Sequence, residues 1–202
     1  MMRAFNQFIS YAFHPLFVPT YGTVFYFLVT PRYSPPEFRL AFILPVAVLT
    51  LLIPLFGFLI LRQLGVLRSL SWLPAAQRGY PLLIYLTLLL IVVLRVVSKG
   101  DSEELYFYFL SMALANATCL LLALSGRVVS LHMAGIGSLL MFLVSLSLHF
   151  EKNIVGAISL CTLATGLLAT ARLYLKAYGR ASVLTGWLIG LLSQLILVRF
   201  WL

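Results

Sequence analysis

The sequence has few charged residues. Asp, Glu, Lys and Arg make up 9% of its 202 residues, whereas an average soluble protein has about 25%. So few charges cannot cover a surface that faces water, which excludes a soluble globular domain. Hydrophobic residues make up 62% of the chain. Lipid must therefore be the solvent for most of the surface, and the sequence predicts an integral membrane protein.

Acidic residues are scarcer than basic ones, with 5 Asp and Glu against 14 Lys and Arg, and the net charge is +9. In a soluble protein this balance would indicate a nucleic-acid partner. Here no run of Lys or Arg alternates with aromatic residues, so we expect no nucleic-acid partner. We expect the cations to meet anionic headgroups of membrane lipids instead.

Cysteine and histidine are also rare. Cys119 and Cys161 both lie in apolar segments and neither has a CxxC partner, so the sequence predicts buried thiols and no redox motif. His132 and His149 have no carboxylate or cysteine at ligand spacing. No metal site and no cofactor are therefore expected.

What the chain does contain is about seven apolar segments near the length that crosses a bilayer, about 20 residues. Each must be helical, because only a helix satisfies its own backbone polar groups in lipid. The sequence thus predicts an all-α fold, a polytopic transmembrane helix bundle of about seven spans, within a range of about six to eight. Pro15 and Pro19 leave open a kinked or re-entrant path for the first segment. The segments are residues 8–29, 40–61, 80–98, 104–124, 131–150, 153–171 and 183–200.

No internal repeat, low-complexity tract or linker divides the chain. Residues 1–202 are therefore predicted to form a single integral membrane domain, and the short loops favour a bacterial inner membrane. Gly186 and Gly190 form a GxxxG pattern, which predicts close helix packing within the bundle or, alternatively, the seam of a homo-oligomer. Asn116 and Gln194 are predicted to form hydrogen bonds between helices.

The charges sort unevenly between the two membrane faces, which we name side A and side B. With the predicted spans, side A carries cations and no acid, whereas side B carries every acid. Either the positive-inside rule explains this pattern, or some of the side A cations form an anion site. Side A carries Arg3, Arg62, Arg68, Arg78, Arg127, Arg172, Lys176 and Arg180. Side B carries Arg32, Arg39, Arg95, Lys99, Lys152, Arg199, Glu37, Asp101, Glu103, Glu104 and Glu151.

Side A gathers the groups that phosphoryl chemistry requires. Arg78 precedes the third span, Ser130 and His132 begin the fifth, and Arg172 and Lys176 end the sixth. Arginines bind phosphate oxygens in bidentate fashion, a serine caps a helix, and a histidine protonates a leaving group. Taken singly, each of these residues is also explained as an anchor at the level of the lipid headgroups.

Three short motifs in this region resemble those of the type 2 phosphatidic acid phosphatase superfamily of membrane lipid phosphatases. SWLPAAQRGYP is similar to the first motif (Lys, six residues, Arg-Pro) at Arg78, and VSLH is similar to the second (Pro-Ser-Gly-His) at Ser130 and His132. ARLYLKAYGRAS is similar to the third (Ser-Arg, five residues, His, three residues, Asp) at Arg172. The resemblance covers a phosphatase-like core of about residues 69–190. Other residues occupy the remaining motif positions: Ser71, Gly79, Val129, Leu131, Ala171, Tyr178 and Ser182.

The resemblance implies that His132 is the general acid and that Arg78 and Arg172 bind the phosphate. Tyr178 stands at the position of the nucleophilic histidine. A phenol with an unperturbed pKa of about 10 is mostly neutral at pH 7, and no carboxylate nearby in sequence can serve as its base. The replacement therefore implies loss of the usual activity, although it leaves open whether the chain is an enzyme.

The function implied is that of a phosphatase-like membrane protein that binds the headgroup of a phosphorylated lipid or isoprenoid on side A. Ser130 and Lys176 would join the arginines around the phosphate. The alternative is a non-enzymatic membrane scaffold or transporter subunit. Proton- or ion-coupled transport is disfavoured, because we expect no acid near the middle of any predicted span.

Overall fold

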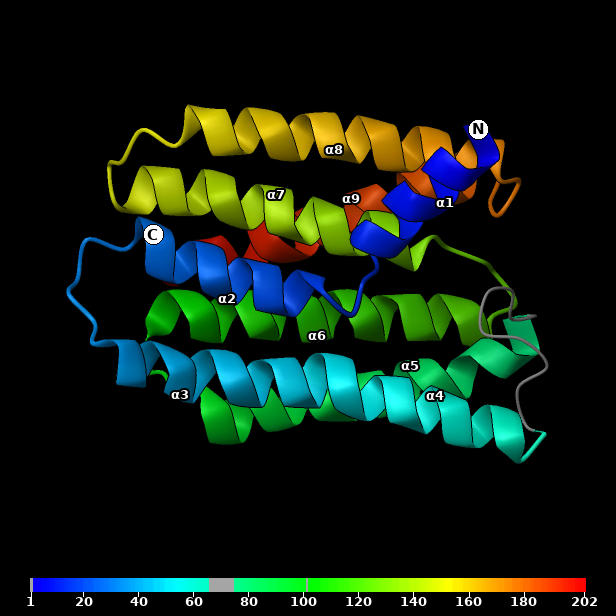
Figure 1. Ribbon diagram of the computed structural model, residues 1–202, viewed down its shortest axis with the longest axis horizontal. Coiled ribbons are helices and arrows are strands. Elements are labelled where there is room, and N and C mark those ends of the chain that lie inside the picture. The colour runs from blue at the N-terminus through cyan, green and yellow to red at the C-terminus, as the bar shows by residue number, and fades with distance from the viewer. Residues whose placement is uncertain (1, 66–74, 101) are drawn as a thin grey trace.

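The structure, a computed structural model, describes residues 2–65, 75–100 and 102–202, apart from the side chains of residues 75–78. Every regular element in these ranges is a helix, which confirms the predicted all-α bundle (Figure 1). The elements are α1 (Met2–Ala12), α2 (Val18–Val29), α3 (Pro36–Ala47), η1 (Val48–Leu52), α4 (Ile53–Gln63), α5 (Ala75–Ile91), η2 (Val92–Val96), α6 (Glu103–Leu124), α7 (Leu131–His149), α8 (Val155–Tyr174) and α9 (Arg180–Val198).

The described residues contain 6 helices long and apolar enough to cross a membrane, which confirms a multi-pass membrane protein. The π-helical segment η1 joins α3 and α4 into the longest of these helices, and η2 extends α5. The number lies within the range predicted from the sequence. The candidate spans are Pro36–Gln63, Gly79–Val96, Glu103–Leu124, Leu131–His149, Val155–Tyr174 and Arg180–Val198.

The first predicted span, residues 8–29, is not one continuous helix. The helix α1 ends at Ala12 and α2 begins at Val18, because Pro15 has no N–H to continue the first helix. Tyrosine hydroxyls donate to carbonyls at the break: Tyr21 to Ala12 O over 3.0 Å and Tyr85 to Pro15 O over 3.3 Å. His14, within the range predicted as the first span, lies in the connection between these two short helices.

Small residues allow α7 and α9 to pack closely near the centre of the bundle. A Cβ atom added at Gly186 would overlap the carbonyl of Ser130, and one added at Gly190 would overlap the carbonyl of Ala134. The two glycines of the GxxxG pattern therefore serve packing within the bundle, as predicted. Figure 1 shows α7 between α8 on one side and α2 and α9 on the other, and α7 also contacts α6.

Side-chain amides join neighbouring helices, which confirms the two hydrogen-bonding positions predicted from the sequence. The Nδ2 atom of Asn116 on α6 donates to Leu82 O on α5 over 2.8 Å. The Nε2 atom of Gln194 on α9 donates to the Ser138 hydroxyl on α7 over 2.8 Å and to Tyr108 O on α6 over 3.2 Å. Because a polar group left without a partner in lipid is costly, these bonds fix the register of the helices.

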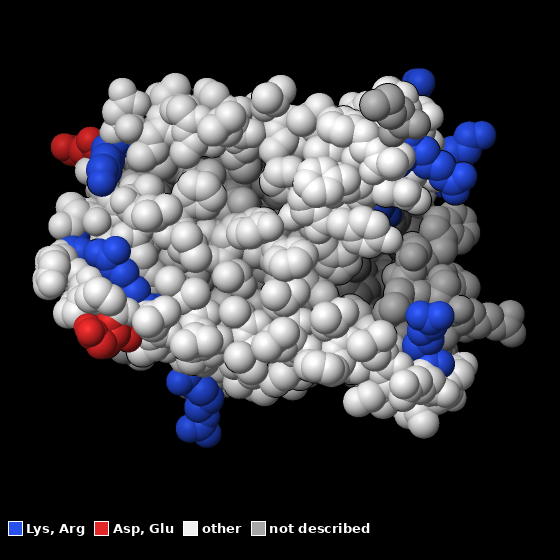
Figure 2. All heavy atoms as spheres, viewed as in Figure 1, with Lys and Arg blue, Asp and Glu red and all other residues white. Residues whose placement is uncertain are grey.

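The ends of the bundle differ in charge. The α6–α7 and α8–α9 connections lie at the end that corresponds to side A, and the α2–α3 and α7–α8 connections lie at the other end, side B (Figure 1). Acidic side chains appear only at the side B end in Figure 2, whereas basic side chains appear at both ends. Arg68 and Asp101 lie outside the described residues.

Candidate functional site

A cavity of about 160 Å³ lies among the side A halves of the helices. Its walls come from the α1–α2 connection, α4, α5, α6, α7 and the end of α8. Most of the lining is apolar, and the polar groups are few. The lining residues are His14, Pro15, Leu16, Phe58, Pro81, Leu82, Tyr85, Met112, Ala115, Asn116, Cys119, Leu131, His132, Ala134, Gly135, Ser138, Arg172 and Tyr178.

Three residues predicted from the sequence meet at this cavity. His132 in the first turn of α7, Arg172 in the last turn of α8 and Tyr178 just beyond it all contribute to the wall. The Arg172 side chain is buried, with 8% of the residue exposed. Its guanidinium carbon lies 5.1 Å from the centroid of the Tyr178 ring, which is a cation–π contact. The chain thus brings together groups that are far apart in its sequence.

The other predicted residues are placed differently. Ser130 is buried at the N-cap position of α7, but its side chain makes no capping hydrogen bond, so the predicted cap is wrong in that respect. Lys176 is exposed and does not line the cavity, because the chain turns there with a φ of 52°. Arg78 lies in α5, and its side chain is outside the described part of the structure.

His132 contributes a ring nitrogen without a hydrogen-bond partner. Its Nδ1 atom is buried and makes no hydrogen bond with the described residues. A neutral imidazole has one N–H and one lone pair. The ring can therefore donate or accept one further hydrogen bond at this atom, according to its tautomer.

His14 is the cavity residue whose place the sequence did not reveal. The centroid of its ring lies 5.0 Å from that of His132, edge to face. The Leu16 N–H donates to His14 Nδ1 over 3.4 Å, so the neutral ring carries its proton on Nε2. His14 lies outside the candidate spans, and burial, followed by the charge of Arg172, lowers its pKa to about 4. The signal in the sequence was an ionisable residue beside a proline in an apolar segment.

The cavity has a positive electrostatic character. Arg172 supplies a positive charge, and none of the lining residues that the structure describes is acidic. Within the described part of the chain, no group of His, Cys, Asp and Glu could hold a metal ion. The arrangement can therefore bind an anion beside an apolar group.

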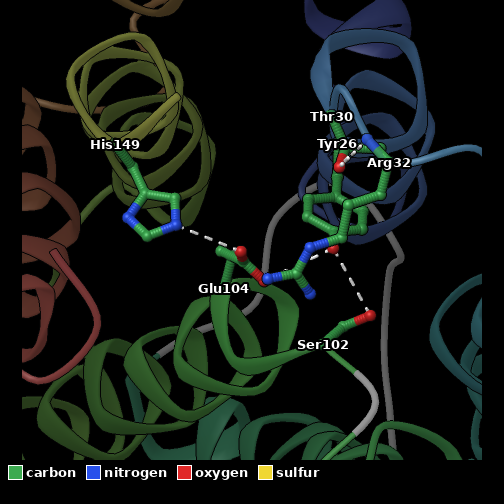
Figure 3. A network of polar contacts seen from close by, with 6 residues as sticks. All are labelled: Tyr26, Thr30, Arg32, Ser102, Glu104 and His149. Atoms are coloured by element: carbon green, nitrogen blue, oxygen red, sulfur yellow. Dashed lines mark hydrogen bonds and ion pairs between the residues drawn. The ribbon is translucent and has the colours of Figure 1, made fainter. Parts of the chain in front are cut away.

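A second polar cluster lies at the side B end, where Figure 3 shows Glu104 facing His149 and Tyr26. The Glu104 carboxylate is 3.2 Å from Nε2 of His149 and accepts a hydrogen bond from Tyr26 over 3.3 Å. The Tyr26 hydroxyl also lies 3.5 Å from the Ser102 hydroxyl. Because these side chains come from α2, α6 and α7, the cluster joins three helices. A cavity of about 280 Å³ lies at the same end of the bundle as this cluster. It is lined by Arg32, Lys99, Gly100, Glu103, Glu104, His149 and Trp201.

The fold and the side A cavity define a polytopic, all-α membrane protein with a cationic, largely apolar cavity at one end. No protein-family model matches the chain, and no curated protein or solved structure is significantly similar to it.

Proposed function

We propose that this protein binds the phosphate headgroup of a lipid or isoprenoid in the side A cavity. The phosphate lies beside Arg172, His14 and His132, and the hydrocarbon chain extends along the apolar wall. The single observation that carries the proposal is a buried guanidinium in a cavity whose described lining residues include no acid.

A buried cation favours an anionic ligand for energetic reasons. Removing a charged group from water costs several kcal/mol, about as much as a good ion pair returns. Arginine binds phosphate oxygens through two parallel hydrogen bonds. A phosphate therefore matches the guanidinium better than an anion that acts as a simple point charge. A phosphate beside Arg172 therefore offsets part of the cost of burying this side chain.

The apolar part of the cavity supports a ligand with a hydrocarbon chain. Phe58, Leu82 and Met112 come from three different helices and line the same space. A free phosphate ion would leave these surfaces uncovered, whereas an acyl or prenyl chain would bury them. This favours a phosphorylated lipid over inorganic phosphate.

We propose binding without hydrolysis, in keeping with the resemblance to lipid phosphatases whose nucleophile this chain lacks. Tyr178 contacts the Arg172 guanidinium through its ring, and among the described residues no carboxylate lines the cavity to act as its base. These features support a phosphatase-like pseudo-enzyme.

Binding of decyl phosphate to the purified protein in detergent tests the proposal. Isothermal titration calorimetry with the wild type should show saturable binding, and Arg172→Gln should weaken it by about tenfold or more, because a charge-assisted hydrogen bond is lost. Arg180→Gln is the matched control, since Arg180 is an exposed side A arginine that does not line the cavity. Equal affinity in the wild type and Arg172→Gln would contradict the proposed site. Release of phosphate by the wild type would contradict binding without hydrolysis.

A further inference from the structure

The side B cavity of about 280 Å³ lies at the ends of the membrane spans. Its lining comes from the α2–α3 connection, the residues before α6, the first turn of α6, the last residue of α7 and the segment after α9. The ends of transmembrane helices lie at the level of the lipid headgroups. The cavity is therefore at the depth of the headgroups of the side B leaflet.

Charges of both signs line this cavity: Arg32, Lys99, Glu103 and Glu104. Glu104 is buried, and its carboxylate lies 3.2 Å from Nε2 of His149, so its charge is already engaged. Arg32, Lys99 and Glu103 are exposed, and within the described part of the chain none of them forms an ion pair. Figure 3 shows the Arg32 side chain extending toward Glu104. Two cations and one acid in a single cavity are therefore available to a ligand.

This mixture of charges favours a ligand that itself carries both signs. A simple anion would be attracted by Arg32 and Lys99 but repelled by the acids, and a simple cation would meet the reverse. A phosphate matches a guanidinium, and a primary ammonium offers three N–H donors to a carboxylate, which only accepts. The volume is near the lower limit for small-molecule sites, about 300 Å³, which suits a headgroup rather than a whole lipid.

We propose that the side B cavity binds the headgroup of a zwitterionic membrane lipid in which a phosphodiester is joined to a primary ammonium. The phosphate lies beside Arg32 and Lys99, and the ammonium donates to Glu103. Trp201, which is buried in the wall, covers the methylene groups between the two charges. The acyl chains stay in the bilayer. This site is at the opposite end of the bundle from the side A cavity and does not depend on the function proposed there.

Three dihexanoyl glycerophospholipids that differ only in their headgroups test the proposal: those of ethanolamine, choline and glycerol. The choline lipid keeps both charges but has no N–H, and the glycerol lipid keeps only the negative charge. Calorimetric titration of the purified protein in detergent should show that the ethanolamine lipid binds at least about tenfold more tightly than either, because only it forms charge-assisted hydrogen bonds with the acid.

Glycerophosphoethanolamine distinguishes a membrane lipid from a soluble zwitterion as the ligand. It has the same headgroup and no acyl chains, so it loses the apolar contacts that hold the lipid at the bundle. We expect it to bind at least about tenfold more weakly than the ethanolamine lipid. Equal affinity would overturn the assignment of a lipid to this site.

Two variants assign the selectivity to the cavity. Glu103→Gln should bring the ethanolamine and choline lipids within about threefold of each other, because the ammonium loses its charged acceptor. Glu37→Gln is the matched control, since Glu37 is an exposed side B acid that does not line the cavity. Arg32→Gln should weaken binding of the ethanolamine lipid by about tenfold, and Arg95→Gln, at an exposed arginine outside the cavity, should not.

The outcomes that contradict this inference are separate from those that contradict the side A proposal. Equal affinity of the wild type for the ethanolamine and choline lipids would overturn it. A preference that survives in Glu103→Gln would also overturn it, provided that circular dichroism shows a folded variant, because the selectivity would then come from elsewhere. Neither result changes the binding of decyl phosphate, which is tested through Arg172 at the other end of the bundle.

Discussion

The ion pair between Glu104 and His149 can be tested with Glu104→Gln, whose effect on stability should have opposite signs in the wild type and in a variant that lacks His149. Replacing His149 with Phe leaves the buried Glu104 carboxylate with its hydrogen bond from Tyr26 but without the histidine. In that background Glu104→Gln should increase stability, because the amide carries no charge to bury. In the wild type the same Glu104→Gln substitution should decrease stability, because it removes the ion pair.

The size of the effect follows from the geometry. With His149 protonated, the two opposite charges, 3.2 Å apart, attract by about 5 kcal/mol at an effective dielectric constant of about 20. The His149 side chain is 25% exposed and that of Glu104 is 3% exposed, so water weakens the attraction from one side only. We therefore expect His149→Phe to cost about 3 kcal/mol, the lower end of the range for breaking a buried pair. Adding Glu104→Gln should recover about half of this loss.

The free energy of unfolding is measured for the wild type, both single variants and the double variant in detergent micelles. Glu103→Gln is the matched control, since Glu103 is the exposed neighbour of Glu104 in the same turn, and it should change stability by about 0.5 kcal/mol or less. Strictly additive effects of His149→Phe and Glu104→Gln would refute the reasoning, because they would show that the two side chains do not interact.

Two further substitutions test the packing and the helix break. Gly190→Leu should lower the melting temperature and weaken the contact between α7 and α9, because its side chain would overlap the backbone of Ala134. The control Gly156→Ala should leave the melting temperature unchanged, because the added methyl group meets no neighbouring atom. Equal melting temperatures of the two variants would contradict the packing. Tyr85→Phe should cost about 1 kcal/mol by removing the hydrogen bond to Pro15 O. The exposed Tyr80 provides the control Tyr80→Phe, and an equal loss in both variants would argue against the hydrogen bond.

The fold class and most helix positions followed from composition and segment length alone. Long apolar segments in lipid must be helical, so the six candidate spans lie close to their predicted ranges. The small-residue pattern at Gly186 and Gly190 correctly placed a helix contact, because small side chains in a membrane helix have few other uses. The first predicted span, residues 8–29, is divided into α1 and α2, and the sequence had left open such a break at Pro15 and Pro19.

The details of the side A cavity were less accessible to sequence reasoning. The alternation of spans between membrane faces was enough to bring His132 and Arg172 to one end of the bundle. It did not indicate that Lys176 turns away from the cavity or that Ser130 makes no cap, since these depend on local backbone angles. The contact of His14 with His132 was missed because it joins the α1–α2 connection to the first turn of α7, two places that no spacing pattern relates.

The side B cluster was missed for a similar reason. The sequence places Glu151 beside His149, whereas the structure pairs His149 with Glu104 from a different helix. The pairing depends on the lateral order of the helices within the bundle. The alternation of spans between the two membrane faces predicts the end of the bundle at which a residue lies. It does not predict which residues are its neighbours at that end.

A distance between phosphorus and histidine nitrogen is the most direct test of the side A site. The protein is labelled with ¹⁵N in its 3 histidines and bound to decyl phosphate, and solid-state NMR measures the dipolar coupling between ¹⁵N and ³¹P. We predict a strong coupling that His149→Asn leaves intact and His14→Asn combined with His132→Asn abolishes. A ligand that binds tightly and shows no coupling to any histidine nitrogen would contradict the account.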